Sequence, residues 1–137
     1  MVFLGGPRQV GKTTLGLSLF GESTTEKHPA YLNWDDPRVP AKLKKMHLPV
    51  DERLLVIDEI HKYARWRNLI KGIYDTEKSS RSILVTGSAR LDYYRKGGDS
   101  LANRYLYYRL HPFSLLELNS NPKQESSFIT EFIVNTI

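Results

Sequence analysis

The sequence predicts a three-layer α/β fold, in which helices cover both faces of a parallel five-stranded sheet. Apolar segments of strand length alternate along the chain with segments of helical character, the order that produces parallel strands joined by crossover helices. Small, acidic or hydroxyl residues follow several of these apolar segments, where parallel sheets bind ligands. The predicted strands cover residues 2–4, 30–34, 54–57, 82–86 and 105–110.

The first predicted strand leads directly into a glycine-rich loop. Residues 6–13 read GPRQVGKT and match the pattern G-x-x-x-x-G-K-[ST] at every fixed position. In such a loop successive backbone N–H groups form a concave nest for phosphate, and the lysine reaches the β- and γ-phosphates. A leucine-rich helical segment follows and ends near Gly21. The strand–loop–helix order favours a phosphate-binding loop over a chance match in a turn, with these candidate contacts: Gly6, Pro7, Arg8, Gln9, Val10, Gly11, Lys12, Thr13 and Thr14.

The second predicted strand ends at Asp35-Asp36-Pro37. Aspartate before proline is typical of a turn and of the start of a helix. We therefore interpret both acids as a helix cap and a charged turn in preference to metal ligands. Residues 39–48 are lysine-rich and predict a short helix or a loop.

The third predicted strand carries the second motif, LLVIDE at residues 54–59. Four consecutive apolar residues indicate a strand buried on both faces, so the two acids fall at its carboxyl end. Asp58 is then placed to hold Mg²⁺ through water, together with the Thr13 hydroxyl, and Glu59 to orient or deprotonate an attacking water. The alternative is that both acids cap the next helix, which we expect to begin near Lys62.

That next helix, residues 62–77, is the clearest amphipathic segment of the chain. Its apolar residues recur at spacings of three and four, which predicts one face packed on the sheet. We expect Trp66 to be a core residue and not a base-stacking platform. His61, next to the second motif, is expected to be a surface or helix-capping residue.

The fourth predicted strand ends in Thr86-Gly87-Ser88. A hydroxyl at this position can contact the γ-phosphate or the attacking water, and Ser88 is a better candidate than Thr86. A strand end followed by a turn is the alternative, because glycine and serine favour turns. Gly97-Gly98 further along predicts a loop, either one that closes over a ligand or a plain turn.

These motifs, in this order, resemble the AAA+ class of phosphate-loop ATPases. The closer resemblance is to the prokaryotic AAA-type ATPase family with a GPRQVGKTTL loop, a DEIHKY-type second motif and TGSARLD before an LHPFSL segment. The sequence has GPRQVGKTTL at 6–15, DEIHKY at 58–63, TGSARLD at 86–92 and LHPFSL at 110–115. The resemblance covers roughly residues 2–118 and implies a phosphate-loop nucleoside triphosphatase fold with strand order 5-1-4-3-2.

The resemblance also implies ATP and Mg²⁺ as cofactors and assigns roles to single residues. Lys12, Thr13 and Asp58 look like the phosphate and magnesium residues, Glu59 like the water-activating base, and Ser88 like the first sensor. Arg104 lies where the family carries an arginine that stabilises charge on its own or a neighbouring subunit's phosphate, so a homo-oligomer is implied. Asn103 stands where the family has glycine. Asparagine tolerates left-handed backbone better than most residues, so we expect the turn to survive.

The domain expected from these motifs is residues 1–118. Residues 119–137 match no motif and are expected to begin a lid or C-terminal region. Serine, asparagine and proline at 119–127 predict a loop or linker, whereas the apolar residues at 128–137 fit either a short strand or a helix. Family members usually continue further, so we expect a truncated product.

Composition restricts the remaining function classes. The chain has 137 residues and no cysteine, which excludes a disulfide framework and a thiolate zinc site. The sequence has neither a spanning apolar segment nor a signal-peptide pattern, so we expect a soluble cytoplasmic protein. The net charge of +5 is a weak indication of nucleic-acid binding, through short clusters such as Arg90, Arg95 and Lys96, and we favour a solvated basic surface as its explanation.

The leading hypothesis from the sequence is therefore Mg²⁺-dependent ATP binding and hydrolysis. Three alternatives stay open: a nucleotide-binding switch without turnover, a nucleic-acid-associated domain, and a remnant that has lost its function.

Overall fold

The computed structural model describes residues 1–88, 91, 101, 103–115 and 117. Its centre is a five-stranded sheet in which every neighbouring pair of strands is parallel. The strands lie in the order β2-β3-β4-β1-β5, which is the predicted order read from the other edge. Their bounds are β1 Val2–Gly5, β2 Tyr31–Asn33, β3 Leu54–Asp58, β4 Ser82–Thr86 and β5 Leu106–Arg109.

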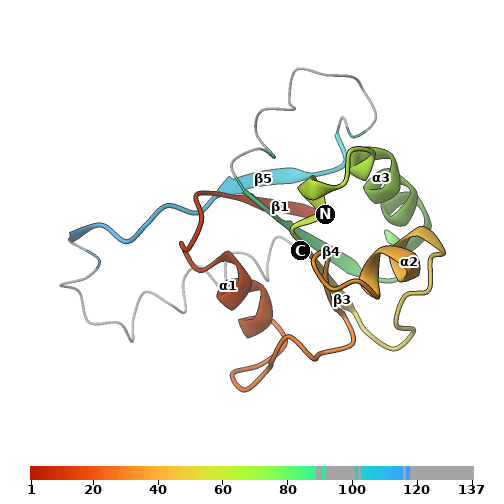
Figure 1. Cartoon of the computed structure of the whole chain (residues 1–137), viewed down its shortest axis with the longest axis horizontal. Coiled ribbons are helices and arrows are strands. Elements are labelled where there is room, and N and C mark those ends of the chain that lie inside the picture. Colours follow the sequence, from red (N-terminus) through yellow and green to blue (C-terminus); the bar gives the residue numbers. More distant parts are fainter. Residues whose placement is uncertain (89–90, 92–100, 102, 116, 118–137) are drawn as a thin grey trace.

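Helices cover both faces of the sheet, as the alternation of segments predicts (Figure 1). Helix α1 follows the glycine loop, α2 follows β2, and a short 3₁₀ helix, η1, precedes α3. The described helices are α1 Lys12–Ser18, α2 Val39–Lys44, η1 Ile60–Lys62 and α3 Trp66–Glu77.

The alternation of side chains along each strand separates two hydrophobic clusters. The larger one lies between the sheet and helices α2 and α3, where Phe3, Ile57 and Val85 meet Leu43 and Ile70. The smaller one lies on the α1 face and contains Val2, Leu4, Tyr31, Val56 and Leu84. Because side chains two residues apart share a face, Asp58 follows Val56 onto the α1 face and Thr86 follows Leu84. The alternation of side chains along the strands therefore directs Asp58 and Thr86 toward α1, the helix after the glycine loop.

The amphipathic helix begins later in the structure than the sequence predicts. The chain makes the η1 turn first, and α3 begins at Trp66 instead of near Lys62. Trp66 is buried with only 4% of its surface exposed, so its predicted place in the core is confirmed. Neither Asp58 nor Glu59 caps α3: its N-cap is Arg65, with no side-chain hydrogen bond to the helix end.

Two further sequence expectations concern turns. Asn103 has a φ of 59°, so it does adopt the left-handed conformation expected where the family has glycine. Asp36 accepts a 2.9 Å hydrogen bond from the Arg38 backbone N–H just before α2, which confirms the charged turn. The expected helix cap is wrong, because the N-cap of α2 is Arg38 and no side chain caps the helix. The Arg90–Arg95–Lys96 cluster, Gly97-Gly98 and the segment 119–137 lie outside the described residues.

Candidate functional site

The glycine loop connects β1 to α1 at the carboxyl edge of the sheet. Gly11 caps α1 with a φ of 91°, a conformation that disfavours any residue with a Cβ. At Gly6 a Cβ would lie 2.3 Å from the Leu110 carbonyl oxygen, so only glycine fits there. Pro7, Arg8 and Gln9 between these glycines are exposed. The loop is thus open to solvent at residues 7–9, directly after a buried strand.

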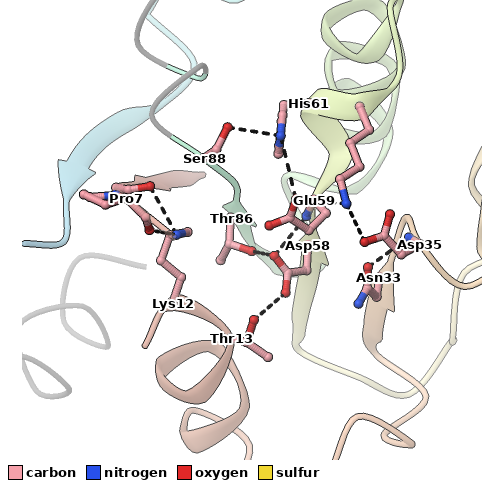
Figure 2. Close-up of polar contacts among 12 residues, drawn as sticks. Pro7, Lys12, Thr13, Asn33, Asp35, Asp58, Glu59, His61, Thr86 and Ser88 are labelled. Atoms are coloured by element: carbon pink, nitrogen blue, oxygen red, sulfur yellow. Dashed lines mark hydrogen bonds and ion pairs between the residues drawn. The ribbon is translucent and has the colours of Figure 1, made fainter. Parts of the chain in front are cut away.

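Lys12 is the first residue of α1 and is buried, with 7% of its surface exposed. Its ammonium group donates a 3.2 Å hydrogen bond to the Gly6 carbonyl and another to the Pro7 carbonyl (Figure 2). A buried cation must be paired or hydrogen-bonded, and here the loop itself supplies both acceptors. The lysine charge is therefore held inside the curve of the glycine loop.

Asp58 ends β3 and is 2% exposed. Its Oδ2 accepts hydrogen bonds from the Thr13 hydroxyl at 2.8 Å and from the Tyr31 hydroxyl at 2.6 Å. Its Oδ1 accepts one from the Glu59 N–H at 2.9 Å and one from the Thr86 hydroxyl. Four donors thus compensate the loss of water around this carboxylate. Burial raises the pKa of Tyr31 above its usual value, and the hydrogen bond to Asp58 and the charge of that carboxylate raise it further.

Glu59 follows in the left-handed conformation, with a φ of 56°. A residue other than glycine or asparagine is strained there, and such strain clusters at functional positions. Its Oε2 lies 3.4 Å from the Lys62 ammonium and 3.7 Å from His61 Nε2. Lys62 in turn forms a 2.5 Å ion pair with Asp35, which follows β2. Glu59 is therefore oriented by groups of the η1 turn.

His61 and Ser88 complete the group. The Ser88 hydroxyl and His61 Nε2 are 3.1 Å apart, and the tautomer of the ring decides which one donates. The His61 side chain is only 9% exposed, so the expectation of a surface or helix-capping residue is wrong. The cause is the η1 turn, which directs the ring toward the end of β4, as Figure 2 shows.

The structure thus brings together most of the predicted site residues. The glycine loop with Lys12, the Thr13–Asp58 pair, Glu59 and Ser88 all lie where β1, β3 and β4 end. Sequence reasoning did not single out Tyr31 and placed Thr86 second to Ser88, although both hydroxyls donate to Asp58. The alternation of side chains along each strand could have placed both hydroxyls on the same face of the sheet as Asp58. The register between neighbouring strands, which brings them within hydrogen-bonding distance of Asp58, is known only from the fold.

Arg104 lies elsewhere. It precedes β5, whose first residues pair with the start of β1, and its Nε donates a 3.2 Å hydrogen bond to Asp75 of α3. The glycine loop follows the other end of β1, so Arg104 is at the amino edge of the sheet and the phosphate loop at the carboxyl edge. This placement does not support a contact with the phosphate of its own chain.

Other features of the described residues bear on ligands. They contain no group of three or more histidine, aspartate or glutamate side chains arranged to hold a metal ion. A surface pocket of about 500 Å³ lies at the amino edge of the sheet, with Met1, Arg53 and Ser82 in its wall, far from Asp58. Among the residues that the structure describes, no helix is long and apolar enough to cross a membrane.

Comparison with known proteins gives an independent view of these features. A family model described as an AAA domain matches residues 1–119. An uncharacterised protein of Methanocaldococcus jannaschii is similar, with 28% identity over 152 residues. That alignment covers 98% of this chain but 31% of the archaeal protein, so the chain spans about a third of the length of this relative.

Proposed function

The chain belongs to the AAA domain family, which makes it a nucleotide-binding domain of the phosphate-loop ATPase type, and on that premise we propose that it binds ATP with Mg²⁺ and hydrolyses it. The single observation that carries the proposal is the hydrogen bond between Thr13 and Asp58. It joins the glycine loop to the end of β3, so both predicted motifs belong to one site.

The phosphates fit the glycine loop. Its residues 7–9 are exposed, and the glycines on either side take conformations that disfavour a side chain, which suits the approach of anionic oxygens to the main-chain N–H groups. Lys12 already donates to two carbonyls of this loop, and phosphate oxygens are stronger acceptors for the same ammonium hydrogens. The β- and γ-phosphates are therefore expected to lie between the loop and Lys12.

Thr13 and Asp58 fit a magnesium ion by their chemistry. A hydroxyl and a carboxylate are the hard oxygen ligands that Mg²⁺ prefers, and the ion usually takes its other ligands from water and substrate phosphates. When bound, the ion would neutralise charge that builds up on the phosphates. The donors to Asp58 from Tyr31 and Thr86 hold the carboxylate at the required place.

Glu59 is the candidate for activating water. Its carboxylate is partly exposed, next to the buried Asp58 and on the same edge of the sheet as the loop. A carboxylate within reach of a water molecule accepts its proton as the oxygen attacks phosphorus. Ser88, which follows β4 and contacts His61 as Glu59 does, is the candidate contact to the γ-phosphate.

Calorimetric titration with ATP tests the binding half of the proposal. We expect Mg²⁺-dependent binding that falls about 10- to 100-fold in Lys12→Ala, because a charge-assisted hydrogen bond contributes about 1.5–3 kcal/mol. Lys45→Ala removes an exposed lysine outside the site and is the matched control. A folded wild-type chain without affinity for ATP contradicts the proposal.

The Glu59→Gln variant tests the hydrolysis half. It keeps the size and polarity of the side chain but removes the base, so binding should persist while hydrolysis falls by about 10²–10⁴. Unchanged hydrolysis would exclude Glu59 as the base. Tight ATP binding without any wild-type turnover would instead favour a nucleotide-binding switch.

A further inference from the structure

His61 lies between two residues that the proposed reaction needs. The same ring nitrogen, Nε2, is 3.1 Å from the Ser88 hydroxyl and 3.7 Å from the Glu59 carboxylate. In Figure 2 the ring stands between these two side chains. The three residues come from separate places, since Ser88 follows β4, Glu59 follows β3 and His61 lies in η1.

The ring has a closely fitted position. A Cβ on Gly87 would lie 2.8 Å from His61 Nδ1 and 3.0 Å from Leu91 Cδ1, so a larger residue at position 87 would displace the imidazole. The glycine therefore allows the ring to pack against the backbone that leads from β4 to Ser88. Together with 9% exposure of the side chain, this contact restricts where Nε2 can point.

A ring nitrogen has a single hydrogen-bonding site at Nε2, either one N–H donor or one lone pair. It cannot bond fully to Ser88 and to Glu59 at the same time. A carboxylate only accepts hydrogen bonds, so the link to Glu59 requires the ring form that carries its proton on Nε2. In that form, once the Ser88 hydroxyl turns to a γ-phosphate, the Nε2–H group can donate to Glu59. A change in the hydrogen bond of Ser88 would therefore change the position of the Glu59 carboxylate.

We propose that His61 is a positioning residue that couples the γ-phosphate contact at Ser88 to the orientation of Glu59. The proposal rests on the proposed ATP hydrolysis and adds to it a link between sensing the γ-phosphate and activating water. Lys62, which contacts the same Glu59 oxygen and pairs with Asp35, supplies a second anchor, so removal of His61 misplaces the carboxylate without releasing it.

Single-turnover hydrolysis and ATP affinity, measured on the same variants, test this role. In His61→Ala we expect the hydrolysis rate to fall about 10- to 100-fold, because a small displacement of a reacting group has an effect of that size. ATP affinity should stay within twofold of wild type. His61→Gln restores an amide near the position of Nε2 and should recover part of the rate. His47→Ala, an exposed histidine far from the site, is the control.

Gly87→Ala provides a second route to the same displacement. If it folds with the circular dichroism spectrum of wild type, it should reproduce the loss of rate in His61→Ala with the ring still present. Equal hydrolysis rates in wild type, His61→Ala and Gly87→Ala would overturn the proposal. A parallel loss of affinity and rate would do the same, because it would show a merely structural role.

Nuclear magnetic resonance of ¹⁵N-labelled histidine gives a readout that needs no turnover. The His61 ring signal, identified by its loss in His61→Gln, should differ between the complexes with ADP and with a non-hydrolysable ATP analogue. This difference should disappear in Ser88→Ala. Identical ring signals in both wild-type complexes would refute the coupling. Absence of nucleotide binding by wild type would refute the proposed function as well, so the two failures are distinguishable.

Discussion

Replacing Tyr31 with phenylalanine removes one hydroxyl from the hydrogen bonds around Asp58 and leaves the aromatic ring in place. Tyr31 is 4% exposed, and its hydroxyl donates to Asp58 Oδ2 at 2.6 Å. The other donors, including Thr13 on the same oxygen, remain. The variant therefore measures one buried hydrogen bond to a carboxylate, with little change in packing.

Hydrogen bonds to charged groups contribute about 1.5–3 kcal/mol to stability, more than those between neutral groups. At pH 7 we expect the free energy of unfolding of Tyr31→Phe to be lower than that of wild type by that amount. A typical domain has about 5–15 kcal/mol in total, so the loss is readily measured.

The difference should depend on pH in a defined direction. The pKa of Tyr31 is raised in the folded protein by burial, by its hydrogen bond to Asp58 and by the negative charge there. In the unfolded chain the phenol ionises near pH 10. Below that value both states keep the proton and the stabilisation is complete. Above it the unfolded state loses the proton first, so wild type is destabilised by about 1.4 kcal/mol for each pH unit. Phenylalanine has no such proton, and the gap between the two proteins should narrow by about 1.4 kcal/mol from pH 9 to pH 11.

Urea unfolding followed by circular dichroism at pH 7, 9 and 11 measures this gap. Tyr74→Phe, which removes a hydroxyl from a partly exposed residue of α3, is the matched control. Equal stability of wild type and Tyr31→Phe at pH 7 would show that the hydroxyl does not stabilise the fold. A gap that stays constant up to pH 11 would show that the folded state does not hold the phenol proton.

Two other predictions concern the core and the surface. Ile70→Ala, in the fully buried face of α3, should lower the free energy of unfolding by about 2–5 kcal/mol, whereas Val50→Ala at an exposed position should change it by less than about 0.5 kcal/mol in urea titrations. The Arg38 side chain, through hydrogen bonds, lowers the pKa of Asp36 to about 2, so the Asp36 carboxyl carbon should titrate near pH 2 by nuclear magnetic resonance and return toward 3.8 in Arg38→Gln. An ordinary Asp36 pKa in wild type would contradict the 2.7 Å ion pair between the Arg38 guanidinium and the Asp36 carboxylate.

The elements that position the site could be predicted because each has a local cause in the sequence. The run LLVI before Asp58 requires burial on both faces, and the glycines of GPRQVGKT require a turn directly after a strand. Alternation of strand and helix then predicts parallel strands, and the resemblance supplies their order, which the sheet confirms. These features depend on residues close together in the chain.

The contacts that the sequence did not reveal depend on register and on turns. Tyr31 reaches Asp58 because Asn33, two residues later, pairs with Asp58 across β2 and β3. His61 reaches Ser88 because η1 interrupts the expected continuous helix. Arg104 follows the family pattern in sequence but lies at the opposite edge of the sheet. A role for Arg104 toward the phosphate of a neighbouring subunit stays a prediction.

The donors to Asp58 also connect stability to function. They come from α1, β2, β4 and the residue after β3, so one buried carboxylate joins four parts of the fold. Removing the charge leaves these donors without a full acceptor, and unsatisfied buried groups are costly. A loss of nucleotide affinity in an Asp58 variant therefore has two explanations, a missing magnesium ligand and a loosened site. The Tyr31→Phe variant separates them, because it loosens the site but keeps both proposed magnesium ligands, Thr13 and Asp58. A loss of nucleotide affinity in this variant, measured together with its free energy of unfolding, is therefore the part that a loosened site alone explains.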